Sequence, residues 1–388
     1  MRIGFDAKRA FNNFTGLGNY SRTLIETLAR YYPENEYHLF TPKTNQNPRL
    51  DFIKSYPSVS VHFPTGIMHS VHPLWRSYFI RNDIKKLRID IFHGLSHELP
   101  FNVSKNVKTV VTIHDLIHER FPEFYPLTDR KIYSWKFKSA CERADIVVAI
   151  SEATKQDIID FYHVDKNKIK VIYQSCHPQF YQNVNLSQRS QRTFLDSFLD
   201  TKAPDNTYNL PENYLLYVGT VNERKNLLGL VKALQIVDNS LDIQLVVIGE
   251  GGDYFQKVKK YVVENNMSNR VLFYNQIPFS DFPLLYKQAQ ALVLPSFFEG
   301  FGIPIIEALW SGCPVITSEG SCFPEAGGPD SMYINPHNIE DIARAIERVV
   351  TDQNLRKQMI LRGGQFVQKF HEKIIGAEWD GLYKSLME

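Results

Sequence analysis

The stretch that decides the fold is ALVLPSFFEGFGIPIIEALWSGCPVITS, residues 291–318. It begins with the short apolar run ALVLP and ends with the similar run PVITS. Between them, Pro304 suits the first turn of a helix, which predicts a helix over residues 303–312 that stops at Gly312. A strand, a helix and another strand in succession are typical of a parallel sheet covered by helices on both faces.

The same alternation runs along the whole chain. Strands are expected in the first half at 2–6, 37–41, 59–63, 89–93, 107–115, 145–151 and 168–173. In the second half they are expected at 213–219, 243–249, 270–275, 291–295, 314–318 and 331–335. This pattern predicts an α/β fold with two Rossmann-like, doubly wound parallel-sheet domains. Ligands of such sheets bind at the carboxyl ends of the strands, so a shared ligand is expected in a cleft between the domains.

The alternation of strands and helices stops at residues 183–212. These residues are rich in Gln, Asn, Ser and Asp, and we interpret them as a linker. The N-terminal domain is then 1–182 and the C-terminal domain 213–370. Residues 371–388 are expected as a helix that could cross back to the N-terminal domain.

Composition narrows the class of function. The 388 residues carry 44 basic and 42 acidic side chains, a net charge of +2, whereas dedicated nucleic-acid binders are usually strongly basic. No nucleic-acid partner is therefore expected. Four scattered cysteines form no C-x-x-C pair, and no apolar run approaches the ~18 residues of a membrane span. Without a recognisable signal peptide, these features favour a cytoplasmic protein with free thiols.

Two acids stand out in the opening stretch. Glu299 is expected in the loop and Glu307 in the early turns of the helix. Carboxylates accept hydrogen bonds from vicinal hydroxyls, so this pair suits the binding of ribose or hexose. A general acid–base pair and two structural acids are the open alternatives. Gly300 and Gly302 let the backbone approach a ligand closely.

A cationic pair follows another expected strand. The segment YVGTVNERKNLLGLVKAL places Arg224 and Lys225 just before a helix that is capped near Asn226. Two cations beside a helix N-terminus repel its positive end unless an anion neutralises them. This favours a diphosphate clamp over a solvated basic loop.

Two features of the first half are candidates for ligand contact. The loop FTGLGNYSRTL places Gly16 and Gly18 after a strand and before a helix expected near 18–32. Its backbone N–H groups suit a phosphate, with a tight structural turn as the alternative. His114 ends the strand TVVTIHD, where it either faces the cleft or is a satisfied structural residue.

The stretch GIMHSVHPLWRSYFIRNDIKKLRID, residues 66–90, mixes aromatic and aliphatic side chains with arginines and lysines. We interpret it either as a helix with a core face and a solvated face, or as a segment that makes peripheral contact with an anionic membrane.

Taken together, these segments resemble the retaining glycosyltransferases of family 4, which have the GT-B fold. The matching segments are TGLGNY, HGLSHELP, TIHDLIHERFPEFY, VVAISEATKQDI, NYLLYVGTVNERKNLLGLVKAL and PSFFEGFGIPIIEALWSGCPVITS. They follow one another in the family's order over roughly residues 1–350. The resemblance is closest to bacterial mannosyltransferases of polysaccharide or glycolipid assembly.

The resemblance implies a nucleotide-diphosphate-sugar donor and a saccharide or lipid-linked saccharide acceptor. The first domain would face the acceptor and the second would bind the donor. Arg224 and Lys225 would bind the donor diphosphate, assisted by backbone N–H groups at Gly16 and Gly18. The nucleotide base would lie near residues 274–278.

For the sugars, the resemblance implies that Glu307 accepts hydrogen bonds from the ribose hydroxyls. Glu299, with the backbone of Phe301 and Gly302, would hold the hydroxyls of the transferred hexose. His114 would touch that hexose near the reacting carbon.

No metal and no other cofactor is expected, because the sequence contains no Asp-x-Asp and the cationic pair can neutralise the leaving diphosphate. The resemblance favours retention by same-face attack, with GDP-mannose ahead of a UDP-sugar as the donor. The alternatives are a sugar-nucleotide epimerase of the same fold and a catalytically silent sugar-nucleotide-binding protein.

Overall fold

The computed structural model describes residues 1–43, 47–66, 71–181, 208–275 and 277–388. Most of the expected linker, like one residue of the expected base-binding strand end (Gln276), lies outside the described residues.

The chain divides into two compact units. Unit 1 consists of Met1–His177 and Phe370–Glu388, and unit 2 of Pro178–Lys369. Among the described residues, no helix has both the length and the apolarity that crossing a membrane requires.

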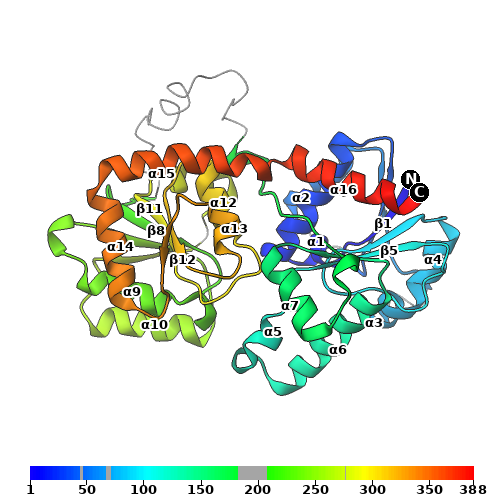
Figure 1. The fold of residues 1–388 in the computed structure, drawn as a ribbon, viewed down its shortest axis with the longest axis horizontal. Helices are drawn as coiled ribbons and strands as arrows, with labels where there is room; N and C mark the ends of the chain where they lie inside the picture. The colour runs from blue at the N-terminus through cyan, green and yellow to red at the C-terminus, as the bar shows by residue number, and fades with distance from the viewer. Residues whose placement is uncertain (44–46, 67–70, 182–207, 276) are drawn as a thin grey trace. The chain divides into compact units, whose positions relative to one another are not determined.

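Unit 1 contains a seven-stranded parallel sheet in the order β3-β2-β1-β4-β5-β6-β7 (Figure 1). Its strands are β1 (Arg2–Asp6), β2 (Glu36–Phe40), β3 (Val59–His62), β4 (Ile91–Gly94), β5 (Lys108–Ile113), β6 (Ile146–Ala149) and β7 (Ile169–Val171). All seven lie within the expected ranges or one residue outside them. The five inner strands are almost wholly buried, because helices cover both faces of the sheet, and this explains their continuous apolar sequences. The edge strands β3 and β7 are partly exposed.

The helices of unit 1 are α1 (Lys8–Asn12), α2 (Gly16–Tyr31), α3 (His72–Leu74), α4 (Ile80–Lys86), α5 (Ile117–Arg120), α6 (Leu127–Arg143), α7 (Glu152–Tyr162) and α16 (Glu372–Met387). The last helix packs beside α2, where Trp379 and Tyr383 are fully buried. The hydroxyl of Tyr383 lies 2.8 Å from Nδ1 of His93 on β4, which fixes the helix against the sheet of unit 1.

Residues 71–90 are mainly a structural part of unit 1. Trp75, in the π-helical turn η3 (Trp75–Phe79), and Ile80, at the start of α4, are buried in the core. Arg76 forms ion pairs with Asp6 at 2.6 Å and Glu98 at 2.8 Å. For these residues the structure shows the first interpretation, a segment with a core face and a solvated face, whereas membrane contact of the stretch stays a prediction.

Unit 2 contains a six-stranded parallel sheet in the order β10-β9-β8-β11-β12-β13. Its strands are β8 (Tyr214–Val218), β9 (Gln244–Ile248), β10 (Val271–Tyr274), β11 (Ala291–Leu294), β12 (Val315–Ser318) and β13 (Met332–Ile334). Its helices are α9 (Leu227–Ile236), α10 (Asp253–Glu264), α11 (Phe282–Gln288), α12 (Ile303–Trp310), α13 (Phe323–Gly327), α14 (Ile339–Thr351) and α15 (Gln353–Phe366). All six expected strands are confirmed.

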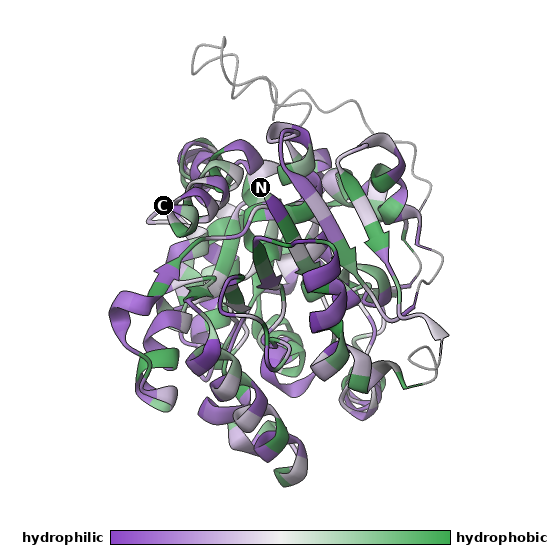
Figure 2. Ribbon diagram, turned by 90° about the vertical axis from the view of Figure 1, so that its right-hand side faces the viewer, coloured by the Kyte–Doolittle hydropathy of each residue, from purple (hydrophilic) through white to green (hydrophobic). Residues whose placement is uncertain are grey.

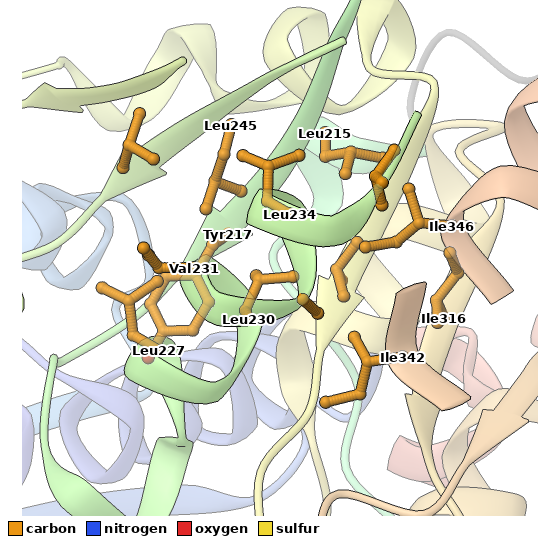
Figure 3. Packing of buried hydrophobic residues seen from close by; sticks show 14 of the residues in the cluster. Leu215, Tyr217, Leu227, Leu230, Val231, Leu234, Leu245, Ile316, Ile342 and Ile346 are labelled. Atoms are coloured by element: carbon orange, nitrogen blue, oxygen red, sulfur yellow. The ribbon is translucent and has the colours of Figure 1, made fainter. Parts of the chain in front are cut away.

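The core of unit 2 holds α9 and α14 against one face of this sheet. Figure 3 shows Leu230 and Leu234 of α9 next to Leu215 of β8, with Ile342 and Ile346 of α14 alongside. Each of these side chains is fully buried. In Figure 2 the central strands are mainly hydrophobic, whereas the helices around them alternate between hydrophobic and hydrophilic residues. The sheet is thus the rigid frame from whose strand ends the candidate site extends.

Candidate active site

The cationic pair lies at the carboxyl end of β8, as the sequence predicts. Arg224 and Lys225 form the last two residues of a single helical turn, η7 (Glu223–Lys225), that separates the strand from α9. The side chain of Asn222 caps this turn by accepting a hydrogen bond from the backbone N–H of Lys225 at 3.2 Å. Asn226 follows in the left-handed conformation, with φ of 54°, and is the N-cap residue of α9.

Glu299 joins this pair. Its Oε1 lies 2.7 Å from Nζ of Lys225, and its Oε2 lies 2.8 Å from Nη1 of Arg224. The hydroxyl of Ser296 donates to Oε1 at 3.1 Å. The guanidinium of Arg224 also donates to the carbonyl of Phe298. The loop after β11 and the turn after β8 therefore form one polar cluster, which we call the clamp cluster: Arg224, Lys225, Ser296 and Glu299.

The clamp cluster is nearly closed to solvent. The side chains of Arg224, Lys225 and Glu299 are 16%, 11% and 12% exposed. Burial acts to raise the pKa of Glu299, but Arg224 and Lys225 outweigh it and bring that pKa down to about 2. The carboxylate is consequently ionised at neutral pH, and it is a weak base.

The geometry shows which anion neutralises Arg224 and Lys225 within the protein. Two cations beside the N-terminus of α9 require a neutralising anion, and within the protein Glu299 supplies it. A diphosphate bound there would share the cations with this carboxylate. The expected role of Glu299 in holding sugar hydroxyls stays a prediction, because both of its oxygens have protein partners here.

The loop that leads from Glu299 into α12 has a defined shape. Gly302 has φ of +100°, a conformation that L side chains rarely adopt, and it is the residue before α12 begins. The thiol Sγ of Cys322 lies 3.1 Å from the carbonyl of Glu299 and 3.2 Å from that of Phe301. Phe301 as a whole is only 2% exposed, so the contact of its backbone with a sugar stays a prediction.

Glu307 is in α12, one helical turn beyond Pro304, and it is 6% exposed. Its Oε2 accepts a hydrogen bond from the hydroxyl of Tyr286 at 2.9 Å. Tyr286 belongs to α11 and is fully buried, so this bond fixes the orientation of the carboxylate. The helix ends at Trp310, two residues before the expected Gly312.

Gly16 and Gly18, which the sequence places in a loop, lie in a helix. Helix α2 begins at Gly16, so Gly16 and Gly18 are both in its first turn. The side chain of Asn13 accepts from the backbone N–H groups of Thr15 at 2.9 Å and of Gly18 at 3.2 Å. A Cβ at Gly18 would lie 1.9 Å from the carbonyl oxygen of Asn13, so this glycine is required for close packing. Its N–H group is already engaged within the protein.

His114 lies just beyond β5 and is buried. Its Nε2 is 2.9 Å from the carbonyl of Leu95, and its Nδ1 is 3.3 Å from the amide of Gln174. The partner carbonyl requires the proton on Nε2, which leaves Nδ1 to accept from the amide. Burial, and the charge of Arg9, lower the pKa of His114 to about 4 in spite of the bond to Leu95, so the ring is neutral at pH 7.

The ring of Tyr20 meets His114 edge-on, with 4.6 Å between the centroids. Since Tyr20 follows Gly18 by two residues, unit 1 brings the start of α2 and the end of β5 together. The contact of His114 with a donor sugar stays a prediction; in this structure both ring nitrogens have protein partners.

Sequence reasoning missed several residues that position the site. Asn13 and Ser296 could have been found, because each precedes its partner by a few residues in a loop. Tyr286 and Gln174 carry no such signal, since their partners are distant in the sequence. Across the described residues, no group of three or more His, Cys, Asp or Glu side chains is placed to hold a metal ion.

Comparisons with known proteins cover both units. Residues 14–179 match the family described as Glycosyltransferase Family 4, and residues 200–365 match Glycosyl transferases group 1. O-antigen chain mannosyltransferase B of Escherichia coli is 25% identical over 407 aligned positions, covering 100% of both chains. O-antigen chain mannosyltransferase RfbU of Salmonella typhimurium strain LT2 is 30% identical over 239 positions, covering 62% of this chain and 60% of the relative.

Two solved structures have the same fold. Sucrose-phosphate synthase from Thermosynechococcus elongatus aligns with a TM-score of 0.75 at 22% identity, covering 100% of this chain and 99% of the other. Anabaena HepE in complex with UDP and glucose aligns with a TM-score of 0.71 at 18% identity, covering 99% of this chain and 100% of the other.

Proposed function

The chain belongs to the family 4 glycosyltransferases with the GT-B fold, and on that premise we propose that it transfers mannose from a nucleotide-diphosphate sugar to a saccharide or lipid-linked saccharide. GDP-mannose is the preferred donor in this proposal and a UDP-sugar the next. Two relatives named O-antigen chain mannosyltransferases support the choice of sugar. Anabaena HepE, which has been solved with UDP and glucose, supports a nucleotide-sugar donor for this fold.

The observation that carries the proposal is the clamp cluster. Glycosyl transfer builds negative charge on the departing diphosphate while the anomeric carbon becomes electron-poor. Two fixed cations at a strand end, held in place by Glu299, are preorganised for that charge, and they need no reorganisation during the reaction. Their low exposure strengthens the attraction relative to bulk water.

The transfer step proposed is a same-face substitution. The acceptor hydroxyl oxygen forms a bond to the anomeric carbon, and the bond from that carbon to the diphosphate oxygen breaks with its electron pair. The hydroxyl proton moves to the departing oxygen. Glu299 does not take this proton, because a carboxylate whose pKa is about 2 is a poor base at neutral pH.

The acid in α12 complements this arrangement. In the proposal, Glu307 accepts hydrogen bonds from the ribose hydroxyls, and the bond from Tyr286 to its Oε2 holds the carboxylate in place. The buried tyrosine fixes the rotamer of the carboxylate, so that less conformational entropy is lost when the ribose binds.

A donor screen followed by a transfer assay tests the proposal. Thermal shifts with GDP, UDP and ADP should rank GDP first. Incubation with GDP-mannose and a mannose disaccharide, with chelator present, should release GDP and give an α-linked trisaccharide by NMR. Conversion of the donor to a new sugar isomer without acceptor would instead identify an epimerase. If no nucleotide sugar is consumed under any condition, the protein is a silent binder and the proposal is wrong.

Loss of activity with chelator and its return with magnesium would contradict the metal-independent part of the proposal alone. The matched variants are Lys225→Ala in the clamp cluster and Lys260→Ala on α10, whose side chain is 72% exposed. Lys225→Ala should lose glycosyl transfer, whereas Lys260→Ala should keep it.

A further inference from the structure

Large exposed hydrophobic side chains are concentrated on one part of unit 1. Leu127, Ile132 and Trp135 of α6 are 62%, 50% and 58% exposed. Tyr78 and Phe79 of η3 are 42% and 39% exposed. Single exposed apolar residues are ordinary on a protein surface, but a cluster of this kind marks an interaction site.

The two segments form one continuous surface. The rings of Tyr78 and Phe101 are stacked with 5.1 Å between their centroids, and those of Phe101 and Trp135 with 5.8 Å. This row of three aromatic rings joins η3 to α6. The guanidinium of Arg143 covers Phe101 at 4.2 Å from its centroid, which adds a cation to the row.

The exposed face of α6 is not needed to hold the helix in place. Ala140 and Cys141 are buried in the core of unit 1, and Phe137 packs against that core. The exposed residues Leu127, Lys131, Ile132, Trp135 and Lys138 lie on the other side, at spacings of four, one, three and three residues. At 100° per residue this spacing gives one continuous stripe of apolar and basic side chains.

Basic charge surrounds the apolar side chains. A groove of about 410 Å³ beside Trp135 is lined by Arg130, Lys131 and Lys138 against one carboxylate, Glu119. Helix α4, directly after η3, exposes Arg81, Lys85 and Lys86. Lys131, Lys138, Arg81 and Lys85 form no ion pair with any carboxylate in the described part of the chain, so their charge is available to a partner.

We propose that this surface, the α6–η3 patch (Tyr78, Phe79, Leu127, Lys131, Ile132, Trp135 and Lys138), seats unit 1 on a bilayer that contains anionic phospholipids. Tryptophan and tyrosine prefer the membrane interface, aliphatic side chains enter its apolar boundary, and lysines pair with anionic headgroups. The patch combines all three. A lipid-linked acceptor would then reach the enzyme along the surface on which it rests; this use depends on the proposed function, whereas membrane binding itself does not.

Trp135 offers a direct readout. The chain has four tryptophans, and the other three, Trp75, Trp310 and Trp379, are at most 2% exposed. A change in tryptophan fluorescence on vesicle binding therefore reports mainly on Trp135. We expect a blue shift with vesicles of phosphatidylglycerol and phosphatidylethanolamine, and quenching when brominated lipids are included. With pure phosphatidylcholine vesicles both effects should be much smaller.

Vesicle flotation of matched variants completes the test. Lys131→Glu/Lys138→Glu should reduce binding to anionic vesicles by about 10-fold or more, and Ile132→Ser/Trp135→Ser should reduce it at every lipid composition. Lys257→Glu/Lys260→Glu on α10 changes the net charge equally and should leave flotation unchanged. Turnover with a water-soluble acceptor should stay normal in all three variants.

The proposal is overturned if the wild-type protein does not float with anionic vesicles, or if the patch variants float as it does. Equal losses in the patch and α10 variants would also overturn it, because they would reduce the effect to net charge. None of these readouts uses glycosyl transfer, so failure of the membrane proposal and failure of the proposed function are distinguishable.

Discussion

The carboxylate of Glu299 lies 2.7 Å from the ammonium nitrogen of Lys225, and the two side chains are only 12% and 11% exposed. The acid belongs to the loop before α12 and the cation to the turn before α9. Their contact joins two loops whose residues, according to the resemblance to family 4, would bind the donor. A diphosphate that binds Lys225 must therefore share this cation with an internal carboxylate.

Replacing Glu299 by Gln should destabilise the protein and strengthen its response to a diphosphate. The variant keeps the shape of the side chain but leaves two nearly buried cations without their anion, which typically costs about 3 kcal/mol. GDP should therefore raise the melting temperature of Glu299→Gln more than that of the wild type. Calorimetry with and without GDP measures both effects.

The control is Glu264→Gln on α10, which removes the 58% exposed partner of Lys260 and should change stability by less than about 0.5 kcal/mol. Equal GDP-induced shifts in the wild type and Glu299→Gln would show that the carboxylate does not compete for the cations.

Tyr286→Phe should weaken donor binding and lower stability by about 1–3 kcal/mol, because Glu307 loses a buried hydrogen bond. The effect should appear in the KM for the donor more than in kcat. Tyr261→Phe, which removes an exposed bond to Gln235, is the control. An unchanged KM would separate Glu307 from donor binding.

As the pH is lowered, the folded chain should lose stability at pH values well above those at which carboxylates titrate. Burial lowers the pKa of His93 to about 3 and that of His114 to about 4, against an ordinary value of 6.5. Between pH 6.5 and 4 the unfolded chain binds protons that the folded chain does not, so stability falls as the pH drops through this window. Urea midpoints at pH 7 and 5 should differ, and His114→Gln should reduce the difference. Equal midpoints for the wild type would contradict this account of the buried histidines.

The four cysteines should be unreactive in the folded protein. All four are buried, and burial raises the pKa of Cys141 and Cys313 to about 12 and that of Cys322 well above its ordinary value. Ellman's reagent at pH 8 should therefore detect no thiol until denaturant is added. Rapid labelling of the native protein would show that the loop around Cys322 opens.

The fold was predictable because its signal is local and repeated. Each strand is a short run of buried apolar residues, such as the residues of β8, and the repetition of such runs between helices leaves few other architectures. Helix boundaries were less accurate. Helix α2 begins at Gly16, two residues before the expected start, and the side chain of Asn13 accepts from the N–H of Gly18 in its first turn. A contact of this kind is not visible in hydrophobic periodicity.

The site was predictable in its parts and not in its contacts. Strand ends marked Arg224, Lys225 and the loop of Glu299, and electrostatics predicted that the cations need an anion. That this anion is Glu299 depends on how β8 and β11 pair, which no local pattern specifies. Two interpretations of the stretch 66–90 stayed open for a related reason: composition does not tell which side of a helical segment faces the core, and the structure shows that Trp75 faces inward.

The central claim is that Arg224 and Lys225 neutralise the leaving diphosphate, and the most direct measurement is steady-state turnover of GDP-mannose by Arg224→Ala, Lys225→Ala and the exposed control Lys260→Ala. The account predicts that each of the first two lowers kcat more than ~100-fold, roughly 3 kcal/mol of lost transition-state stabilisation, while the control keeps wild-type turnover. Near-normal kcat in both clamp variants, with their folding confirmed by calorimetry, would contradict it.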